Sequence, residues 1–321
     1  KLVSLVALTA LLCPLSPATA ADESATEFPG PSHYLRTAIQ GGTVLQTNSF
    51  LEGDNATGEP IDHFNSIRLD FGWQTDGSKD WHHSYNFPSY GLGIYGADLY
   101  SEDLGTPTSL YGFFVWPLHR GHKWRFNFDI NFGFTNDWKA YDPVNNPQQV
   151  AMGLGRSVHI EGGPNAEYFL SDRWSLIGGF TFTHFSNGGT QRPNEGINQV
   201  GPILYVKYAT DEPTPPPVRR QISKYPDNWD LTVTGSAGKR NLDLQITDPD
   251  QATQYLNKSY FIGNLTVGAA RKFSNKFRYY LGLDFCYDGS VGDIMRIDGY
   301  NNGYNVDPKG SDYLDLAAVA G

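Results

Sequence analysis

Apolar and polar residues alternate in short segments along most of the chain. The clearest run, from Lys123 to Phe134, places aromatic or aliphatic residues at even positions and mainly charged or amide residues at odd positions. Successive side chains of a β-strand point to opposite faces, so this period of two predicts a strand with one apolar and one polar face. The same signal predicts eleven strands and the start of a twelfth: 33–42, 62–75, 89–99, 108–118, 123–136, 157–170, 173–187, 197–209, 229–239, 259–272, 277–288 and 312–321.

The lengths of the connections form a second pattern. Short connections join the fourth strand to the fifth, the sixth to the seventh and the tenth to the eleventh: 119–122, 170–172 and 273–276. Connections of the opposite parity are long: 43–61, 137–156, 240–258 and 289–311. Outer-membrane barrels have short periplasmic turns and long outer loops. We therefore expect an all-β protein, an antiparallel transmembrane β-barrel with 12 or 14 strands in the full-length protein.

Two segments do not fit this plan. Residues 312–321 make only half a strand, and lipid tolerates no open sheet edge, so we expect the natural protein to continue beyond Gly321. The proline-rich connection 210–228 is long where a short periplasmic turn is expected, and the pattern does not explain it.

The chain start and the composition refine this picture. Residues 1–20 have the charged start, apolar run and small-residue cleavage site of a signal peptide, 21–32 form a polar leader, and 33–321 form the expected barrel. A content of 14% aromatic residues with 35 glycines fits a barrel, although mean hydropathy is −0.42. A net charge of −10 argues against nucleic acid as a partner. Cys286 is the only cysteine after the signal, which excludes a disulfide framework and a multi-cysteine metal site.

Candidate chemistry lies at the end of strand 173–187. The apolar face of this strand continues onto His184 and Ser186, which in a membrane barrel point at lipid. Twelve steps of about 3.3 Å separate Trp174 from Ser186, or roughly 30 Å of height after a tilt of about 40°. Ser186 is then expected at the outer boundary of the hydrocarbon layer, where the ester bonds of outer-leaflet lipids lie.

The residues from His184 to Gly189, His-Phe-Ser-Asn-Gly-Gly, are followed by Pro-Asn-Glu-Gly-Ile over 193–197. This combination resembles the signature of the lipid A 3-O-deacylase (PagL-like) and acyloxyacyl hydrolase family of outer-membrane barrels. The resemblance is dense over 184–198 and architectural elsewhere. It implies an integral protein of the bacterial outer membrane, an esterase that removes an ester-linked acyl chain from lipid A of lipopolysaccharide without a metal or another cofactor.

The resemblance also assigns roles by position. Ser186 corresponds to the nucleophile and His184 to its general base. Asn198 stands where the smaller deacylases have a glutamate, and Glu195 is the alternative group to orient the histidine. The resemblance implies an oxyanion and substrate group of four residues: Asn187, Gly188, Gly189 and Asn194.

The sequence is also compatible with a second interpretation, in which the protein is not an enzyme. A His-x-Ser pair on a strand usually has no catalytic role, and the motif could be a degenerate one in a porin or a structural surface protein. The polar face of the predicted strands, with Arg68, Asp70 and Asp129, fits either a closed polar plug or the lining of a pore. The oligomeric state, including a homodimer, is not decided by the sequence.

Overall fold

The structure is a computed structural model that describes residues 32–121, 123–212, 219–222, 225, 228–241 and 258–320. These residues form two compact units that divide after Ile222. The signal peptide expected over 1–20 and the leader expected over 21–32 lie outside the described residues, apart from Ser32.

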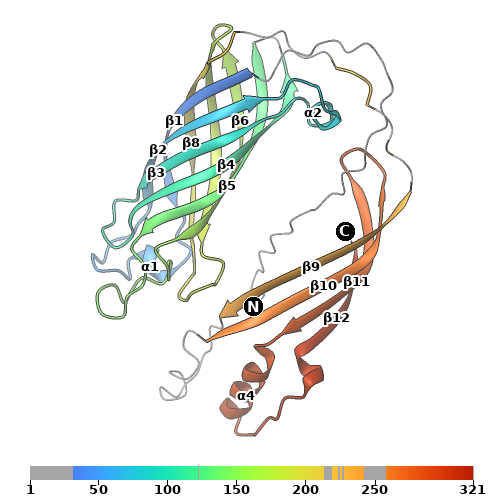
Figure 1. The fold of residues 1–321 in the computed structure, drawn as a ribbon. Coiled ribbons are helices and arrows are strands. Elements are labelled where there is room, and N and C mark those ends of the chain that lie inside the picture. The colour runs from blue at the N-terminus through green and yellow to red at the C-terminus, as the bar shows by residue number, and fades with distance from the viewer. Residues whose placement is uncertain are drawn as a thin grey trace. The chain divides into compact units, whose positions relative to one another are not determined.

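The first unit is a closed antiparallel barrel of eight strands in sequence order (Figure 1). Its first half consists of β1 (Ser32–Val44), β2 (His63–Gln74), β3 (Ser89–Asp98) and β4 (Gly105–Arg120). Its second half consists of β5 (Trp124–Trp138), β6 (Ser157–Phe169), β7 (Trp174–Ser186) and β8 (Ile197–Ala209). The barrel closes where β1 pairs with β8, with Ile39 opposite Leu204 and Thr43 opposite Val200.

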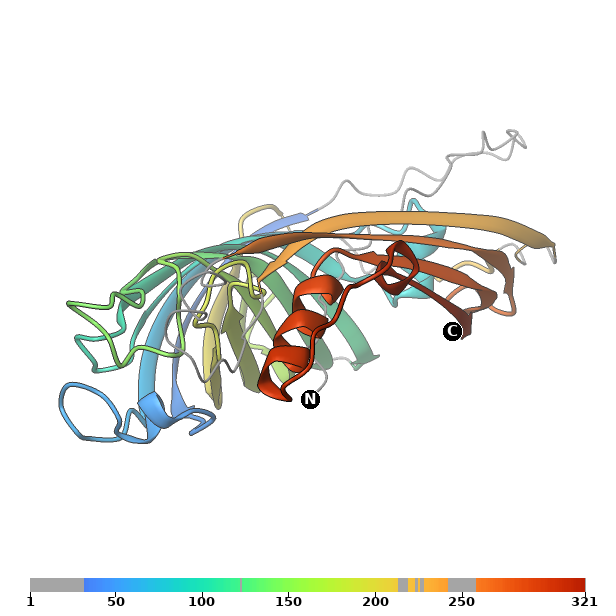
Figure 2. The ribbon, with the colours of Figure 1, turned by 90° about the horizontal axis from the view of Figure 1, so that it is seen from below.

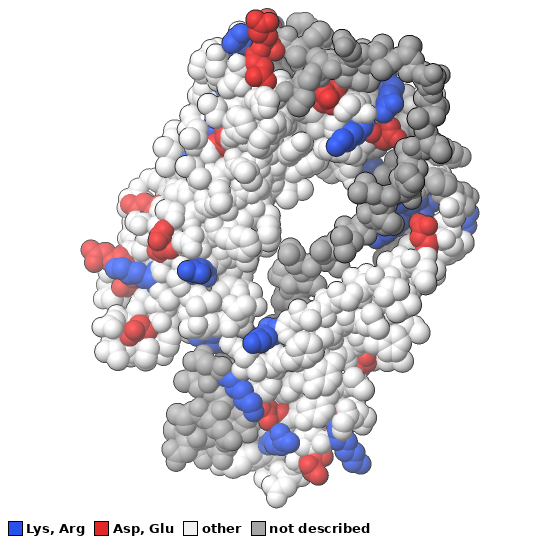
Figure 3. Space-filling view, in the orientation of Figure 1, with Lys and Arg blue, Asp and Glu red and all other residues white. Residues whose placement is uncertain are grey.

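Side chains alternate between the two faces of the barrel wall. Ile67, Leu110 and Phe134 face outward and are 60–63% exposed, whereas Arg36 and Arg68 face inward and are buried. An apolar exterior around a polar interior is what a lipid-embedded barrel requires. On the face shown in Figure 3, charged residues gather mainly toward the ends of the barrel and leave a broad uncharged band between them.

The barrel interior is filled by paired charges. Arg36 donates to Asp70 and to Asp129, each at 2.7 Å, while Arg68 donates to both carboxylate oxygens of Glu161 at 2.6 and 2.9 Å. All five side chains are buried. Charges withdrawn from water are tolerated where each has a partner of opposite sign. These buried ion pairs favour the interpretation of the barrel interior as a closed polar plug over its interpretation as the lining of a pore.

We expect the full chain, reconstituted in a planar bilayer, to pass little current, because the paired charges occupy the space that ions would need in an open lumen. Single-channel recording at several salt concentrations measures this directly. Stable, salt-dependent steps of porin size would contradict the plug and would revive the pore interpretation.

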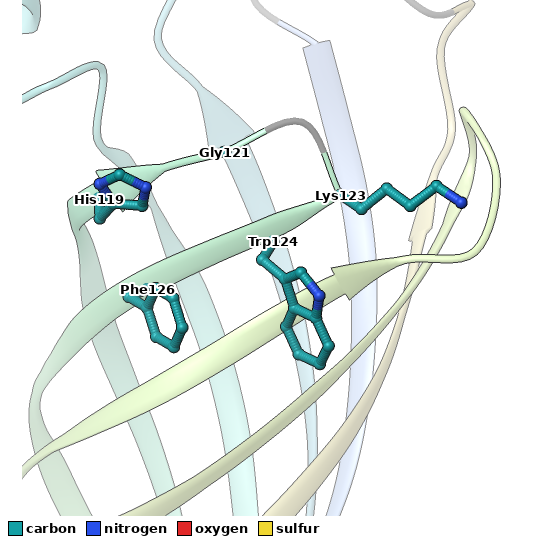
Figure 4. Close-up of a pocket in the computed structure, with 5 residues that line it drawn as sticks. All are labelled: His119, Gly121, Lys123, Trp124 and Phe126. Carbon is teal, nitrogen blue, oxygen red and sulfur yellow. The ribbon is translucent and has the colours of Figure 1, made fainter.

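The two ends of the barrel differ. The β1–β2 connection, with helix α1 (Ser49–Glu52), and the β5–β6 connection gather at one end in both Figure 1 and Figure 2. Short turns lie at the other end, although the β2–β3 connection there carries helix α2 (Asp80–Ser84). Trp124 and Phe126, each 49% exposed, line a cavity of about 510 Å³ beside the β4–β5 turn (Figure 4). Aromatic side chains at this level are typical of a membrane interface.

The second unit is a four-stranded antiparallel sheet in the order β12-β11-β10-β9. Its strands are β9 (Trp229–Asn241), β10 (Ser259–Lys272), β11 (Arg278–Asp288) and β12 (Leu314–Ala320), with helix α4 (Val291–Asn301) and the 3-10 helix η1 (Gly310–Tyr313) between the last two. Among the described residues, no helix has the length and apolar character needed to cross a membrane.

The structure confirms the all-β antiparallel barrel and the positions of all twelve predicted strands, but it corrects the strand number. The barrel closes with eight strands, not 12 or 14, and the last four form a separate sheet. Alternation identifies a strand but not its partner, so it did not reveal that β1 pairs with β8. Closure of this barrel therefore requires no strand beyond Gly321, and the proline-rich connection 210–228 spans the division between the two units.

Candidate active site

The candidate site is built where β7 ends and β8 begins, at the long-loop end of the barrel. His184 pairs with Asn198 across the two strands, and Phe185 pairs with Ile197. Phe185 and Ile197 point inward and are fully buried. Side chains alternate along a strand, so His184 and Asn198 point outward. The sequence prediction that these groups share the outer face agrees with this arrangement.

The His184 imidazole contacts the Asn198 side chain. His184 Nδ1 lies 2.7 Å from Asn198 Oδ1. A carbonyl oxygen only accepts hydrogen bonds, so Nδ1 carries the proton and Nε2 is left as the basic nitrogen. Glu195, the alternative orienting group, is exposed, and the contact found for it is a backbone hydrogen bond from its N–H to Val150 O at 3.1 Å. The geometry thus favours Asn198 over Glu195.

Ser186 is half-buried and lies two residues beyond His184 on the same face. Its Oγ accepts a hydrogen bond from the backbone N–H of Gly188 at 3.4 Å. Within the described part of the chain, no hydrogen bond joins Ser186 to His184. Catalytic hydrogen bonds are often long or unformed without substrate. A hydroxyl that accepts one hydrogen bond can still donate another, so the contact with Gly188 leaves the Ser186 O–H free to donate.

Asn187 makes three hydrogen bonds within the loop that follows β7. Its backbone N–H donates to Asn194 Oδ1 at 2.8 Å, its Nδ2 donates to Gln191 O at 2.8 Å, and its Oδ1 accepts from the Gly189 N–H at 2.9 Å. These bonds fold the 187–196 loop in the way that asparagine commonly stabilises turns. The Asn187 side chain and the Gly189 amide are therefore engaged within the loop, and their part in an oxyanion group stays a prediction.

Two of the predicted oxyanion donors remain suitable. The Gly188 N–H already points at Ser186 Oγ, beside which the oxyanion of an attacked ester would form. Asn194 uses its Oδ1 for the Asn187 amide, and its Nδ2 has no hydrogen-bond partner among the described residues. Gly188 has φ +66°, a left-handed conformation that glycine adopts without steric cost.

Gly196 is a structural element of the site that the sequence analysis did not single out. It has φ +78°, and a β-carbon there would lie 3.0 Å from Phe185 O and 3.1 Å from His184 Cε1. Its N–H donates to Ala151 O at 3.0 Å, and its carbonyl accepts from Asn48 Nδ2 at 3.1 Å. Because Gly196 has no β-carbon, the loops that carry Ala151 and Asn48 can hold the start of β8 close to the His184 imidazole.

The β1–β2 connection also reaches the site. The Leu45 N–H donates to Asn198 O at 2.8 Å, and Asn198 Nδ2 donates to Thr47 Oγ1 at 3.3 Å. Thr47 lies 151 positions from Asn198 along the chain. No local motif marks a contact of this range, which is why sequence reasoning missed it.

We expect Gly196→Ala to lower deacylation about 10- to 100-fold, because the added methyl group displaces His184 and small misplacements of a catalytic group are costly. Gly58→Ala is the matched control, since Gly58 has φ +73° but open space around a β-carbon. Initial rates on lipid A, compared for the two folded variants, measure the difference. Equal rates would show that the contact with His184 does not matter.

No group of three or more His, Cys, Asp or Glu side chains suited to a metal ion occurs in the portion of the chain that the structure describes. The predicted site residues include a serine, a histidine and side-chain amides, which fit acyl transfer through a serine nucleophile.

Three of the solved structures that match this chain are as follows. Neisserial surface protein A is 8% identical, with a TM-score of 0.38, covering 56% of this chain and 99% of that chain. The outer membrane enzyme PagL is 17% identical, with a TM-score of 0.35, covering 54% and 98%. The N-terminal β-barrel domain of Pseudomonas aeruginosa OprF is 9% identical, with a TM-score of 0.33, covering 56% and 100%. No curated protein sequence gives a significant match.

Comparison with family models gives two matches, one in each structural unit. Residues 65–207, which run from β2 to β8, match the lipid A 3-O-deacylase (PagL) family. Residues 227–321, which contain the second sheet, match the C-terminal domain of acyloxyacyl hydrolase. The chain therefore belongs to the PagL family of lipid A 3-O-deacylases and acyloxyacyl hydrolases.

Proposed function

We propose that this integral outer-membrane enzyme, a lipid A deacylase by family, hydrolyses an ester-linked acyl chain with Ser186 as the nucleophile and His184 as the general base. The observation that carries the proposal is the hydrogen bond between His184 Nδ1 and Asn198 Oδ1, which leaves Nε2 basic on the face that also presents Ser186. The membership of the chain in the PagL family supports the substrate, lipid A of lipopolysaccharide.

The chemistry follows a two-step acyl transfer. Ser186 Oγ attacks the acyl carbonyl carbon while His184 Nε2 takes its proton, and the carbonyl oxygen becomes an oxyanion held by Gly188 N–H and Asn194 Nδ2. The bond between the acyl carbon and the sugar oxygen then breaks, and His184 returns the proton to this departing oxygen. Water, activated by His184, attacks the acyl-Ser186 ester and releases the fatty acid and free serine.

Asn198 in place of a carboxylate changes the energetics of the imidazolium. The amide oxygen accepts the Nδ1 proton and fixes the tautomer, but it carries no formal charge to stabilise His184 once both nitrogens are protonated. This enzyme is therefore expected to rely more on hydrogen-bond geometry than a relative with a glutamate at this position.

The surroundings of the site suit an acyl chain. Phe182 is 47% exposed on β7 and Leu204 is 49% exposed on β8, both on the outer face that carries His184. A groove of about 680 Å³ on this side is lined by glycine and apolar residues such as Gly178 and Pro202, together with the polar Gln40 and Asn65. A lipid in the outer leaflet can place its chain along this surface while its ester reaches Ser186, so the substrate need not leave the membrane.

The full chain, refolded in detergent and incubated with purified lipid A, tests the proposal. We expect mass spectrometry to show loss of one ester-linked acyl chain and release of the matching fatty acid, with the amide-linked chains retained. A heat-unfolded sample is the control for spontaneous hydrolysis. A folded protein that leaves lipid A intact would refute the proposed activity.

A further inference from the structure

We propose that Thr47 is a positioning residue that holds the Asn198 carboxamide in the orientation that supports His184 as a base. The inference rests on the proposed function and extends it to a side chain from the opposite end of the barrel sequence. The hydrogen bonds form a line from Thr47 Oγ1 through Asn198 to His184 Nδ1, with donor–acceptor distances of 3.3 and 2.7 Å.

An asparagine at this position has a requirement that a carboxylate lacks. A carboxylate offers His184 an equivalent oxygen whichever way it turns, whereas a carboxamide has an accepting and a donating end. If Asn198 presented Nδ2 to His184, the imidazole would have to accept at Nδ1 and carry its proton on Nε2. In that tautomer it could not take the proton of Ser186, so only one orientation of Asn198 is productive.

Thr47 supports the productive orientation when His184 becomes doubly protonated. At that point the imidazolium donates from Nδ1, and only Oδ1 of Asn198 can accept. Thr47 Oγ1 then accepts from Asn198 Nδ2, so the donating end of the carboxamide keeps a partner. Hydrogen bonds in such a chain polarise one another, which makes the accepting oxygen more negative. This polarisation partly replaces the formal charge that a glutamate would supply.

The backbone holds Thr47 at this place. The Leu45 N–H donates to Asn198 O at 2.8 Å, and the buried Asn48 donates from Nδ2 to Gly196 O at 3.1 Å. Asn48 also accepts from the Leu51 N–H at 3.1 Å and so caps helix α1. Thr47 therefore lies between two residues that are tied to the start of β8, which keeps its hydroxyl beside Asn198.

The test compares Thr47→Val, Thr47→Ser and the matched control Thr43→Val, each as the full chain refolded in detergent and assayed on lipid A. Thr43 is exposed on β1 beside the same strand. We expect Thr47→Val to lower kcat about 10-fold with little change in KM. It should also move the acid limb of the pH–rate profile to lower pH, because the His184 imidazolium loses support. Thr47→Ser should restore the rate, and Thr43→Val should match the wild type.

The same substitution in an Asn198→Asp background separates positioning from general damage. A carboxylate needs no fixed orientation, so Thr47→Val should cost less than 3-fold there. A wild-type rate and pH profile for Thr47→Val, or an equal loss in both backgrounds, would overturn the inference while leaving the proposed function intact. A wild-type chain that is folded but inactive would instead overturn the proposed function, and this inference with it.

Discussion

Ser186→Ala is expected to reduce the release of fatty acid from lipid A by at least about 10³-fold, because loss of the nucleophile removes the covalent route and leaves only binding and oxyanion contacts. Mass spectrometry of lipid A after incubation with equal amounts of folded wild type and variant measures the loss. A serine-directed fluorophosphonate should also label the wild type and fail to label the variant.

Ser171→Ala is the matched control for this substitution. Ser171 precedes β7 at its opposite end, where its Oγ accepts from the Trp174 N–H at 3.1 Å. We expect this variant to keep wild-type activity and labelling. Activity in Ser186→Ala close to that of the control would assign the chemistry to a group other than Ser186.

Glu161→Ala is expected to lower the free energy of unfolding of the barrel by about 3–5 kcal/mol, the usual cost of leaving one member of a buried ion pair alone. Glu161 accepts from both terminal nitrogens of Arg68, from Asn131 Nδ2 at 2.7 Å and from Thr183 Oγ1 at 2.7 Å. Its removal takes the charged partner from Arg68 and the acceptor from Asn131 and Thr183, and leaves Arg68 Nη2 with the neutral Gln40 Oε1 at 2.7 Å. Denaturant unfolding in detergent, followed by the gel mobility of the folded barrel, measures the change.

The paired replacement Arg68→Met with Glu161→Leu provides the comparison. It removes both charges at once, so no buried charge is left unpaired, and we expect it to be less destabilised than Glu161→Ala alone. If the single variant were as stable as the wild type, the ion pair would not stabilise the barrel and the interior would have to be hydrated.

The strands were predictable because alternation is a local property. The run from Trp124 to Phe134 shows an outer and an inner face without knowledge of its neighbours, and β5 occupies those positions. Closure was not predictable in this way, because the pairing of Ile39 with Leu204 depends on two segments far apart in the chain. Helix α4 lies in the connection 289–311, for which the strand pattern predicted no element.

In the candidate site, too, the residues on strands were predictable and the contacts made by loops were not. His184, Ser186 and Asn198 could be placed on one face, since each lies at an even step along a strand. The loop chemistry could not be derived, because the hydrogen bonds of Asn187 depend on how residues 187–196 fold back on themselves. The contribution of Thr47 depends on closure of the barrel and was therefore beyond any local pattern.

The seam between β1 and β8 has a consequence for when the enzyme becomes active. Leu45 and Thr47 follow the first strand, and Asn198 belongs to the last, so their contacts form only when the two ends of the barrel meet. A chain in transit to the membrane carries Ser186 and His184 close together in sequence but lacks these contacts. The enzyme is thus expected to stay latent until insertion is complete, and the onset of lipid A hydrolysis would report the final step of barrel assembly.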